Sequence, residues 1–302
     1  MTTADSRRDA RLTRWLAQDA AAPAIAQRAA AWFAAEPAAV ILARGEDGYP
    51  PRLAALEGMP AFLAVLGEVR LLAAPRAVAV VGSRRATPYG RELATTLARQ
   101  LGAAGVTVVS GFARGIDGAA HRGATGSAGN TVAVLGCGPD VAYPAAHAEL
   151  RQALLAGGGA IVSQYLPGTP PLAANFPRRN AVVSALAEAV VVVEAQEKSG
   201  AVLTAGLAGE QGRMVLAMPG RVGENSGGCH RLIRDGAVLA EGAADVLVEL
   251  GWAAELLAEN AAPVAVTMAE HAVLAALAGE RQADELAVPG MQPAQLAATL
   301  TQ

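Results

Sequence analysis

Short apolar runs recur through the middle of the chain, and helical stretches separate them. Each run is four to six residues long and consists mainly of valine, alanine, leucine and isoleucine. The predicted strands are 77–81, 106–109, 131–135, 160–163, 189–194 and 214–218. Continuous apolar strands that alternate with helices are typical of a mostly parallel sheet covered by helices on both faces. The sequence therefore predicts an α/β fold for residues 71–250.

Two smaller segments flank this region. Residues 11–35 are predicted to be helical, and turn signals follow between Gly45 and Pro60. We therefore expect residues 1–70 to be a small helical module with a linker, and 65–75 to be a short connector. Residues 263–302 have the order helix, short helix, turn and helix, which is the outline of a helix-turn-helix. The chain stops where a winged helix would place its two strands, so we expect a truncated winged-helix-like module, with a docking role as well supported as DNA contact.

Composition excludes several classes of protein. The two cysteines, Cys137 and Cys229, are far apart and have no CxxC partner, so neither a disulfide framework nor a zinc site is expected. No apolar run approaches the length of about twenty residues that a membrane span needs. The N-terminal residues lack the apolar core of a signal peptide. We expect a protein of the reducing cytoplasm with no membrane span, no metal and no cofactor.

The charge is unevenly distributed. The whole chain has a net charge of −3, which argues against a nucleic-acid partner. Residues 76–250, however, carry 15 Lys and Arg against 13 Asp and Glu, whereas 251–302 carry one Arg and six acidic residues. Any basic surface therefore lies on the central region, and the acidic C-terminal segment masks it in the total.

The first candidate site follows the strand 77–81 and consists of Gly82, Ser83 and Arg84. Glycine lets the backbone approach a phosphate, serine donates a hydrogen bond, and the next helix directs its N-terminal amides outward. An ordinary strand–helix turn explains these three residues equally well. The pattern is neither a Walker motif nor GxGxxG, so it does not indicate a nucleotide cofactor.

A second loop, 110–117, also follows a strand and begins a helix. Gly111 and Gly115 frame it, and Asp117 stands where a helix cap is expected. His121 is interpreted as a packed helix residue. A catalytic pair would need a nucleophile or a metal at suitable spacing, and the sequence supplies none, so no catalytic residue is expected.

Three further loops carry aromatic, cationic or small residues. In 175–180, Phe176 stands beside two arginines, and stacking plus backbone charge is what a single strand requires. A buried Phe176 with solvated arginines is the competing interpretation. Lys198, Ser199 and Gly200 lie between a predicted strand and a predicted helix, as the first two candidate sites do. Residues 218–220 are expected to shape the rim of the binding surface. Because these loops follow parallel strands, they meet at one end of the sheet and form an anion-binding surface long enough for a nucleic-acid strand.

The ordered motifs resemble the DprA/Smf family (DNA-processing protein A). They are VAVVGSRRATPYG, SGFARGIDGAAH, TVAVLGCGPDVAYP, FPRRN, VVVEAQEKSGAVLTA, MPG and GCHRLIRDGA, and the resemblance covers residues 49–250. It implies an extended Rossmann-like fold, single-stranded DNA binding without cleavage, protection of incoming DNA, loading of the RecA recombinase during natural transformation, and a homodimer. The stretch 236–250 is expected to form part of the dimer contact. The flanking modules also resemble the family's accessory domains.

The resemblance implies a set of DNA contacts. The DNA-binding residues expected are Gly82, Ser83, Arg84, Gly111, Phe112, Gly115, Phe176, Arg178, Arg179, Asn180, Lys198, Ser199 and Gly200. The family usually continues FPRRN with another arginine, whereas this chain has Ala181, which removes one potential phosphate contact.

Two other functions stay open. The first is a Rossmann-type phosphoribohydrolase-like enzyme in which Glu194 or Asp117 acts as acid or base, although the PGGxGTxxE-like motif of such enzymes is absent. The second is a scaffold that binds only proteins, but it leaves the donor-rich loops unexplained. A DNA-binding protein that is not an enzyme is the function we expect.

Overall fold

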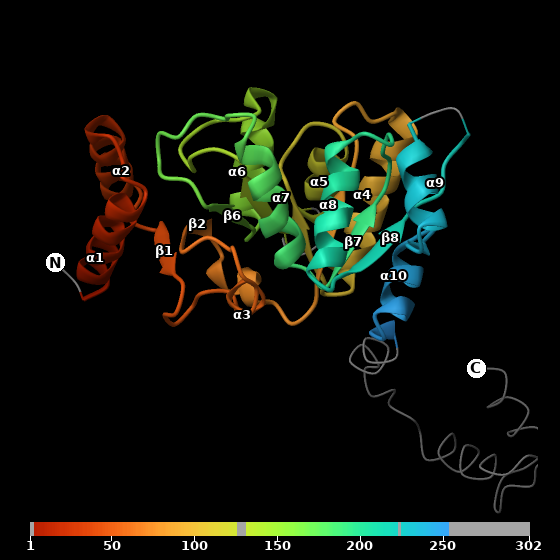
Figure 1. The fold of residues 1–302 in the computed structure, drawn as a ribbon, viewed down its shortest axis with the longest axis horizontal. Coiled ribbons are helices and arrows are strands. Elements are labelled where there is room, and N and C mark those ends of the chain that lie inside the picture. Colours follow the sequence, from red (N-terminus) through yellow and green to blue (C-terminus); the bar gives the residue numbers. More distant parts are fainter. Residues whose placement is uncertain (1–2, 126–130, 223–224, 254–302) are drawn as a thin grey trace, which may run out of the picture. The chain divides into compact units, whose positions relative to one another are not determined.

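The computed structural model describes residues 3–125, 131–222 and 225–253 (Figure 1). The chain divides after Leu250 into two units. The elements described below belong to the first unit. The helix-turn-helix predicted for 263–302 lies outside the described residues and stays a prediction. Within the described ranges, every helix is too short or too polar to cross a bilayer.

The described residues form a nine-stranded sheet in the order β1-β2-β6-β5-β4-β3-β7-β8-β9. The parallel strands are β3 (Ala77–Val81), β4 (Thr107–Ser110), β5 (Thr131–Leu135), β6 (Ala160–Ser163), β7 (Ala189–Val192), β8 (Met214–Ala217) and β9 (Val238–Leu239). The six predicted strands match six of these to within two residues. The predicted α/β fold with a mostly parallel, Rossmann-like sheet is therefore confirmed.

The order of the strands places a crevice beside β3. This strand lies between β4 and β7, so the chain leaves β3 toward one side of the sheet and later returns to its other side. Loops that diverge at such a switch point leave a crevice beyond the carboxyl ends of the strands. The loops after β3, β4 and β7 are the ones that meet there.

The N-terminal region extends the sheet. β1 (Val40–Ala43) pairs antiparallel with β2 (Phe62–Gly67), which pairs antiparallel with β6. The sequence predicts a linker here, and the interpretation of 65–75 as a connector is wrong for residues 65–67. The run 62–66 is as continuous and apolar as the predicted strands, but the strand was missed because the connector assigned to 65–75 divided it. Strands on both sides of residue 70, where the sequence analysis separates two segments, thus belong to one sheet.

The predicted helix 11–35 is wrong as a single element. The structure has two helices, α1 (Thr3–Gln18) and α2 (Pro23–Ala35). Pro23 stands in the first turn of α2, where its missing N–H has no cost, whereas inside a continuous helix it would remove a hydrogen bond. Trp15 of α1 stacks on Phe62 of β2, and Phe33 of α2 belongs to the same core cluster. The two helices therefore cover the outer strands of the sheet.

Helices cover both faces of the parallel strands (Figure 1). One face is covered by α7 (Asn175–Ala185) and α8 (Gly200–Glu210), whose Val182 and Ala205 belong to the same core as Val81 and Val192. The other carries α4 (Pro88–Ala103) and α5 (Ile116–Thr125), which pack side by side. The remaining elements are α3 (Pro51–Ala54), η1 (Val69–Ala73), η2 (Ala145–His147), α6 (Ala148–Ala156), α9 (Gly227–Arg234) and α10 (Ala243–Glu249).

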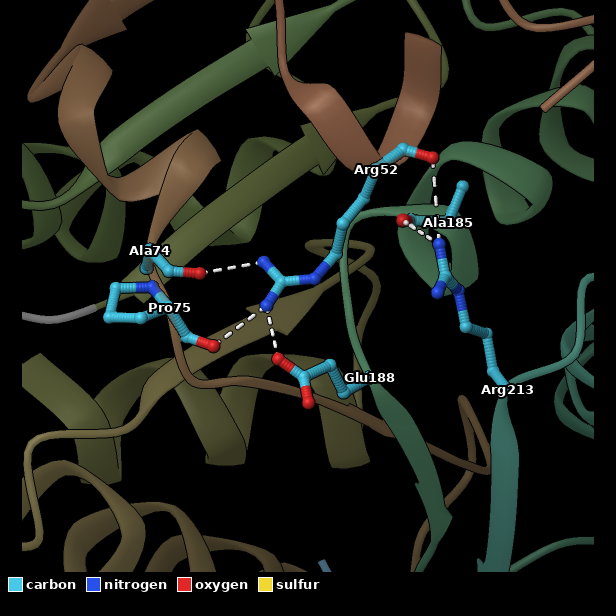
Figure 2. A network of polar contacts seen from close by, with 6 residues as sticks. All are labelled: Arg52, Ala74, Pro75, Ala185, Glu188 and Arg213. Carbon is cyan, nitrogen blue, oxygen red and sulfur yellow. Dashed lines mark hydrogen bonds and ion pairs between the residues drawn. The ribbon is translucent and has the colours of Figure 1, made fainter. Parts of the chain in front are cut away.

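Two arginines bind backbone carbonyls at the amino ends of the strands (Figure 2). Arg52 of α3 donates to Ala74 O at 2.6 Å and to Pro75 O at 2.8 Å, and it forms an ion pair with Glu188 just before β7. Arg213, just before β8, donates to Ala185 O at 3.3 Å and to Arg52 O at 3.5 Å. We call these contacts the amino-edge network. They attach α3 to the central sheet.

Candidate nucleic-acid interface

A cavity of about 530 Å³ opens at the carboxyl ends of the parallel strands, where the switch point places a crevice. The loops after β3, β4 and β7, the middle of α7 and the first turns of α5 and α8 form its walls. It is lined by Val81, Gly82, Ser83, Arg84, Arg85, Gly111, Ala113, Asp117, Arg179, Asn180, Val183, Gln196, Ser199, Gly200, Ala201, Thr204 and Asn225. We call it the first cavity.

Eight of the thirteen predicted DNA-binding residues line the first cavity. They are Gly82, Ser83, Arg84, Gly111, Arg179, Asn180, Ser199 and Gly200. The predicted residues that do not line it are Phe112, Gly115, Phe176, Arg178 and Lys198. Ala181 does not line it either; its carbonyl accepts a hydrogen bond from Gln211 Nε2 at 3.1 Å.

The loop after β3 is fixed to the end of β7. The Ser83 backbone N–H donates to Glu194 O at 2.7 Å, and the Arg85 N–H donates to Ser83 Oγ at 3.1 Å. A Cβ at Gly82 would stand 2.8 Å from Glu194 O, which is closer than real Cβ atoms approach. Glycine is therefore required for this approach of the two loops.

The loop after β4 packs directly on the loop after β3. The Ile116 N–H donates to Ser83 O at 3.2 Å. Gly115 has a φ of +79°, which side chains rarely adopt, and a Cβ at this position would overlap Ser83 O. Gly115 thus joins the two loops without lining the cavity.

Arg179 is a buried cation in the cavity wall. It is 3% exposed, and its guanidinium donates to Gly111 O and, at 2.7 Å, to Val134 O. Its Nε donates to Asn180 Oδ1 at 3.1 Å. Burial lowers the pKa of Arg179, and the nearby charge of Asp117 partly offsets this. Most of its hydrogen-bonding capacity serves the fold, so Arg179 differs from the exposed cations.

Asp117 is the buried carboxylate of the wall. It is 6% exposed, and its Oδ2 accepts a hydrogen bond from the Ala113 N–H at 3.2 Å. Burial raises the pKa of Asp117, and the positive charge of Arg179 opposes that rise. Ala113 precedes α5 and Asp117 is the second residue of that helix, so the carboxylate closes the preceding loop and does not cap the helix as the sequence predicted.

The two phenylalanines have different environments. Phe112 is 3% exposed, has a φ of +58°, and its ring packs between His121 and His147 at centroid distances of 5.5 and 5.2 Å. It is thus part of the core in this structure and presents no stacking face. Phe176 is partly exposed, and the Arg84 guanidinium lies over its ring, 4.8 Å from the centroid. Tyr143 packs against Phe176 at 5.8 Å.

His121 of α5, which contacts Phe112, is held in its neutral form. Its Nδ1 lies 2.8 Å from Thr131 Oγ1, whose own proton goes to Val108 O. Nδ1 therefore carries the imidazole hydrogen, and the buried Nε2 has no partner among the described residues. Burial lowers the pKa of His121 to about 3. This geometry agrees with its interpretation as a packed helix residue.

Arg84 lines the cavity, and Arg178 and Lys198 each precede a lining residue in the chain. Arg84, Arg178 and Lys198 are exposed, and none has an ion-pair partner in the part of the chain that the structure describes. Beside them, Ser199 Oγ caps α8 by accepting from the Val202 N–H at 3.4 Å. Free positive charge and a helix N-terminus both favour an anion at this edge.

Asn225 is a cavity residue that the sequence motifs did not indicate. Its Nδ2 donates to Arg85 O at 3.2 Å and to Glu194 Oε1 at 3.3 Å, and its Oδ1 accepts from Gln196 Nε2 at 2.8 Å. The Glu194 carboxylate also accepts from Thr87 Oγ1 at 2.6 Å. The buried Glu194 thus organises three loops. No local pattern around Asn225 signals this role, because the contact joins distant segments.

Comparison with known proteins identifies the family. Residues 40–251 match the family model described as DNA recombination-mediator protein A. A relative from Mycobacterium tuberculosis is 46% identical over 246 residues, which cover 78% of this chain and 63% of that protein. Protein Smf of Escherichia coli is 45% identical over 203 residues, which cover 67% of this chain and 54% of that protein. The chain therefore matches less than two thirds of the length of each.

Two solved structures agree with this assignment. DNA processing protein A from Streptococcus pneumoniae superposes with a TM-score of 0.67 at 38% identity, over 72% of this chain and 77% of that one. DNA processing protein A from Helicobacter pylori, for which a single-stranded DNA binding mode is described, superposes with a TM-score of 0.64 at 31% identity, over 70% and 95%. The resemblance to DprA/Smf proteins is thereby confirmed, and the chain belongs to the DNA recombination-mediator protein A family.

Proposed function

We propose that this protein binds single-stranded DNA along the carboxyl edge of its sheet. The observation that carries the proposal is the convergence of the loops on one cavity. Exposed cations without an ion-pair partner among the described residues lie in its lining or next to it in the chain. Arg84, Arg178 and Lys198 contact phosphates, and the backbone at Gly82 and Gly200 approaches the strand closely. Phosphate contacts of this kind provide affinity without sequence preference.

Aromatic side chains beside the cavity favour a single strand over a duplex. Unstacked bases bind aromatic faces, and only a single strand offers them freely. Phe176 and Tyr143 pack together, Tyr143 is exposed, and Arg84 of the cavity lining lies over Phe176. The family member from Helicobacter pylori, 31% identical to this chain, is described as a single-stranded DNA binder, which supports the proposal.

The proposal extends to a cellular role. As a member of its family, the protein protects incoming DNA in the cytoplasm and loads RecA onto it during natural transformation. It acts as a homodimer through 236–250, where β9 is an edge strand and Leu239 and Val248 are 47% and 63% exposed. An unpaired strand edge with exposed apolar residues suits self-association. Light scattering of Val248→Glu tests this: a mass unchanged from wild type contradicts the interface.

The protein acts by binding and is not an enzyme in this proposal. One observation favours the alternative, a nucleotide hydrolase: Asp117 lines the cavity and burial raises its pKa, a property of general acids. Glu194, in contrast, is buried and accepts hydrogen bonds from Thr87 and Asn225. Incubation with nucleoside monophosphates, followed by chromatography for released base, separates the two. Released base that is lost in Asp117→Asn establishes the hydrolase.

Binding to labelled oligo-dT, measured by fluorescence anisotropy across a salt titration, tests the main proposal. We expect affinity to fall steeply with salt, and the logarithmic slope to shrink by about 0.7 for each phosphate contact removed. Arg84→Ala and Lys198→Ala should each weaken binding and flatten the slope. Arg99→Ala, which removes an exposed arginine of α4 that does not line the cavity, is the matched control.

Two results would contradict the proposal. If wild-type protein fails to retain oligo-dT at low salt, single-stranded DNA is not its ligand, and a scaffold that binds only proteins becomes the better interpretation. If Arg84→Ala and Lys198→Ala leave the salt slope unchanged, as the control Arg99→Ala should, DNA binds elsewhere on the molecule.

A further inference from the structure

A second cavity lies beside the first, between the start of α4 and the loop after β8. Its volume is about 720 Å³, and it is lined by Thr87, Pro88, Tyr89, Pro219, Gly220 and Arg221. The sequence indicated only that 218–220 shapes a rim, and the proposed function uses none of these residues. The loop after β8 leaves a carboxyl end of the sheet, so both cavities open at the same edge.

Two side chains of the second cavity are suited to a nucleotide. Tyr89 is 58% exposed, although an aromatic ring of this size gains most when it is buried. Arg221 is exposed and has no ion-pair partner among the described residues. An exposed ring and a free guanidinium in one cavity combine a stacking face with a phosphate contact.

The two cavities are neighbours along the chain. Arg85 lines the first cavity and Thr87 lines the second, and two residues span at most about 7 Å. Asn225 of the first cavity donates to Arg85 O and to the Glu194 carboxylate, to which Thr87 also donates. The segment 85–87 is therefore an ordered ridge between the cavities, and exposed Arg85 stands on it.

The far wall of the second cavity is also held in place. The His230 ring nitrogen Nε2 lies 2.9 Å from Gly220 O, which joins the loop after β8 to α9. A Cβ at Gly220 would overlap Ser226 Oγ, so the loop packs tightly against the residue that precedes α9. A site with fixed walls loses little conformational entropy when it binds a ligand.

We propose that a single strand longer than the first cavity holds continues over Arg85 into the second cavity, where a base stacks on Tyr89 and a phosphate contacts Arg221. This inference rests on the proposed function and adds the direction in which the strand leaves the first cavity. The second cavity contributes only when the strand is long enough to reach it. The dependence of affinity on oligonucleotide length is therefore its signature.

The test measures the affinity of the full chain for oligo-dT of increasing length. For wild type, affinity should rise in one further step as the strand extends past the length that fills the first cavity. Tyr89→Ala should abolish this step and weaken binding of the long oligonucleotide by about fivefold or more, while short oligonucleotides bind as before. Tyr89→Phe, which keeps the ring, should restore the step, and Arg221→Ala should reduce it.

Arg99→Ala is again the matched control, because Arg99 is an exposed residue of the same helix as Tyr89 and lines neither cavity. Photo-crosslinking with 5-iodouracil at single positions is the second measurement. A crosslink to Tyr89 should form only with oligonucleotides that show the additional step in affinity.

The outcomes separate this inference from the proposed function. If short oligo-dT binds and the length step survives in Tyr89→Ala, the strand takes another path and only this inference is overturned. Equal losses for short and long strands in Tyr89→Ala also overturn it, because the substitution then acts on the first cavity. If no oligo-dT binds to wild type, both proposals fail.

Discussion

The two ends of the sheet both gather arginines, but they use them differently. At the amino ends, Arg52 is held by two carbonyls and by Glu188, and Arg213 is held by two further carbonyls. At the carboxyl ends, Arg84 and Arg178 are exposed and have no ion-pair partner in the described structure. The same residue type therefore serves folding at one end and is free for a ligand at the other.

Arg179 is the exception that makes the comparison useful. It stands beside Arg178 in the chain and lines the first cavity, yet it is buried and donates to Gly111 O and Val134 O, as an arginine of the amino-edge network does. Partners and burial, rather than position in a motif, distinguish a structural arginine from a binding one.

Replacing Arg179 by alanine should have the largest effect. The change leaves two buried carbonyls without a donor and Asp117 without its nearby positive charge, so we expect a loss of about 3–5 kcal/mol in the free energy of unfolding. Urea denaturation measures it. The control is Arg178→Ala, which removes the exposed neighbour. Equal stabilities of the two variants would show that Arg179 is no more structural than Arg178.

The molecule should also be sensitive to acid at His121, which is buried against Thr131 at the start of β5. The folded-state pKa of His121, about 3, lies below its ordinary value of 6.5, so its contribution to stability is present above pH 6.5 and is lost as pH falls toward 3. We expect the free energy of unfolding to fall by about 1.4 kcal/mol per pH unit in that window. Denaturant titrations at several pH values measure the slope.

His121→Asn isolates this effect, because an asparagine amide keeps the donor to Thr131 and does not titrate. The slope between pH 6.5 and 4 should flatten in the variant. Asp117 acts in the opposite direction, since its pKa is raised and its contribution is lost as pH rises through the folded value. An unchanged slope in His121→Asn would assign the acid sensitivity to other groups.

Arg52→Ala should cost less than Arg179→Ala and should leave DNA binding intact. The variant loses the hydrogen bonds to Ala74 O and Pro75 O and the ion pair with Glu188, but the site is partly open to water, so we expect about 2 kcal/mol. Thermal denaturation and anisotropy with oligo-dT measure the two properties. A loss of affinity in the folded variant would show that the two ends are coupled.

Arg178→Ala should leave stability nearly unchanged and weaken DNA binding. Its side chain is exposed and unpaired among the described residues, so stability should change by less than about 0.5 kcal/mol. Affinity for oligo-dT should fall, and the salt slope should shrink by about 0.7. A stability loss as large as that of Arg52→Ala would place Arg178 among the structural arginines.

Ala181→Arg should have the smallest effect. The family resemblance predicts an arginine here, but Ala181 does not line the cavity and its carbonyl bonds to Gln211. We expect affinity for oligo-dT to change by less than about twofold, the usual size of a surface effect. A large gain in affinity would extend the binding surface along α7.

The parallel strands could be predicted because their signal is local. Each is a continuous valine- and alanine-rich run between loops, and β3, β5 and β6 match the predicted bounds. β2 carries the same local signal, but it was missed because the connector assigned to 65–75 divided its apolar run. The break between α1 and α2 was available in the sequence as Pro23, but the apolar pattern of 11–35 obscured it.

The site was predictable in its loops and less so in the roles of its residues. The switch point explains why motifs far apart in the chain meet at one cavity. Phe112, however, follows Gly111 in a loop, and only the structure shows its ring between two histidines. Asn225 was missed because its hydrogen bonds connect segments that are distant in the chain and share no sequence pattern.

The close packing at Gly82 and Gly115 affects how this surface can be altered. Arg84, Arg178 and Lys198 are exposed, so a substitution library should exchange them widely and still yield folded protein. At the two glycines, any side chain meets the backbone of a neighbouring loop. An engineered change of ligand should therefore alter the charged residues and keep the glycine framework that presents them.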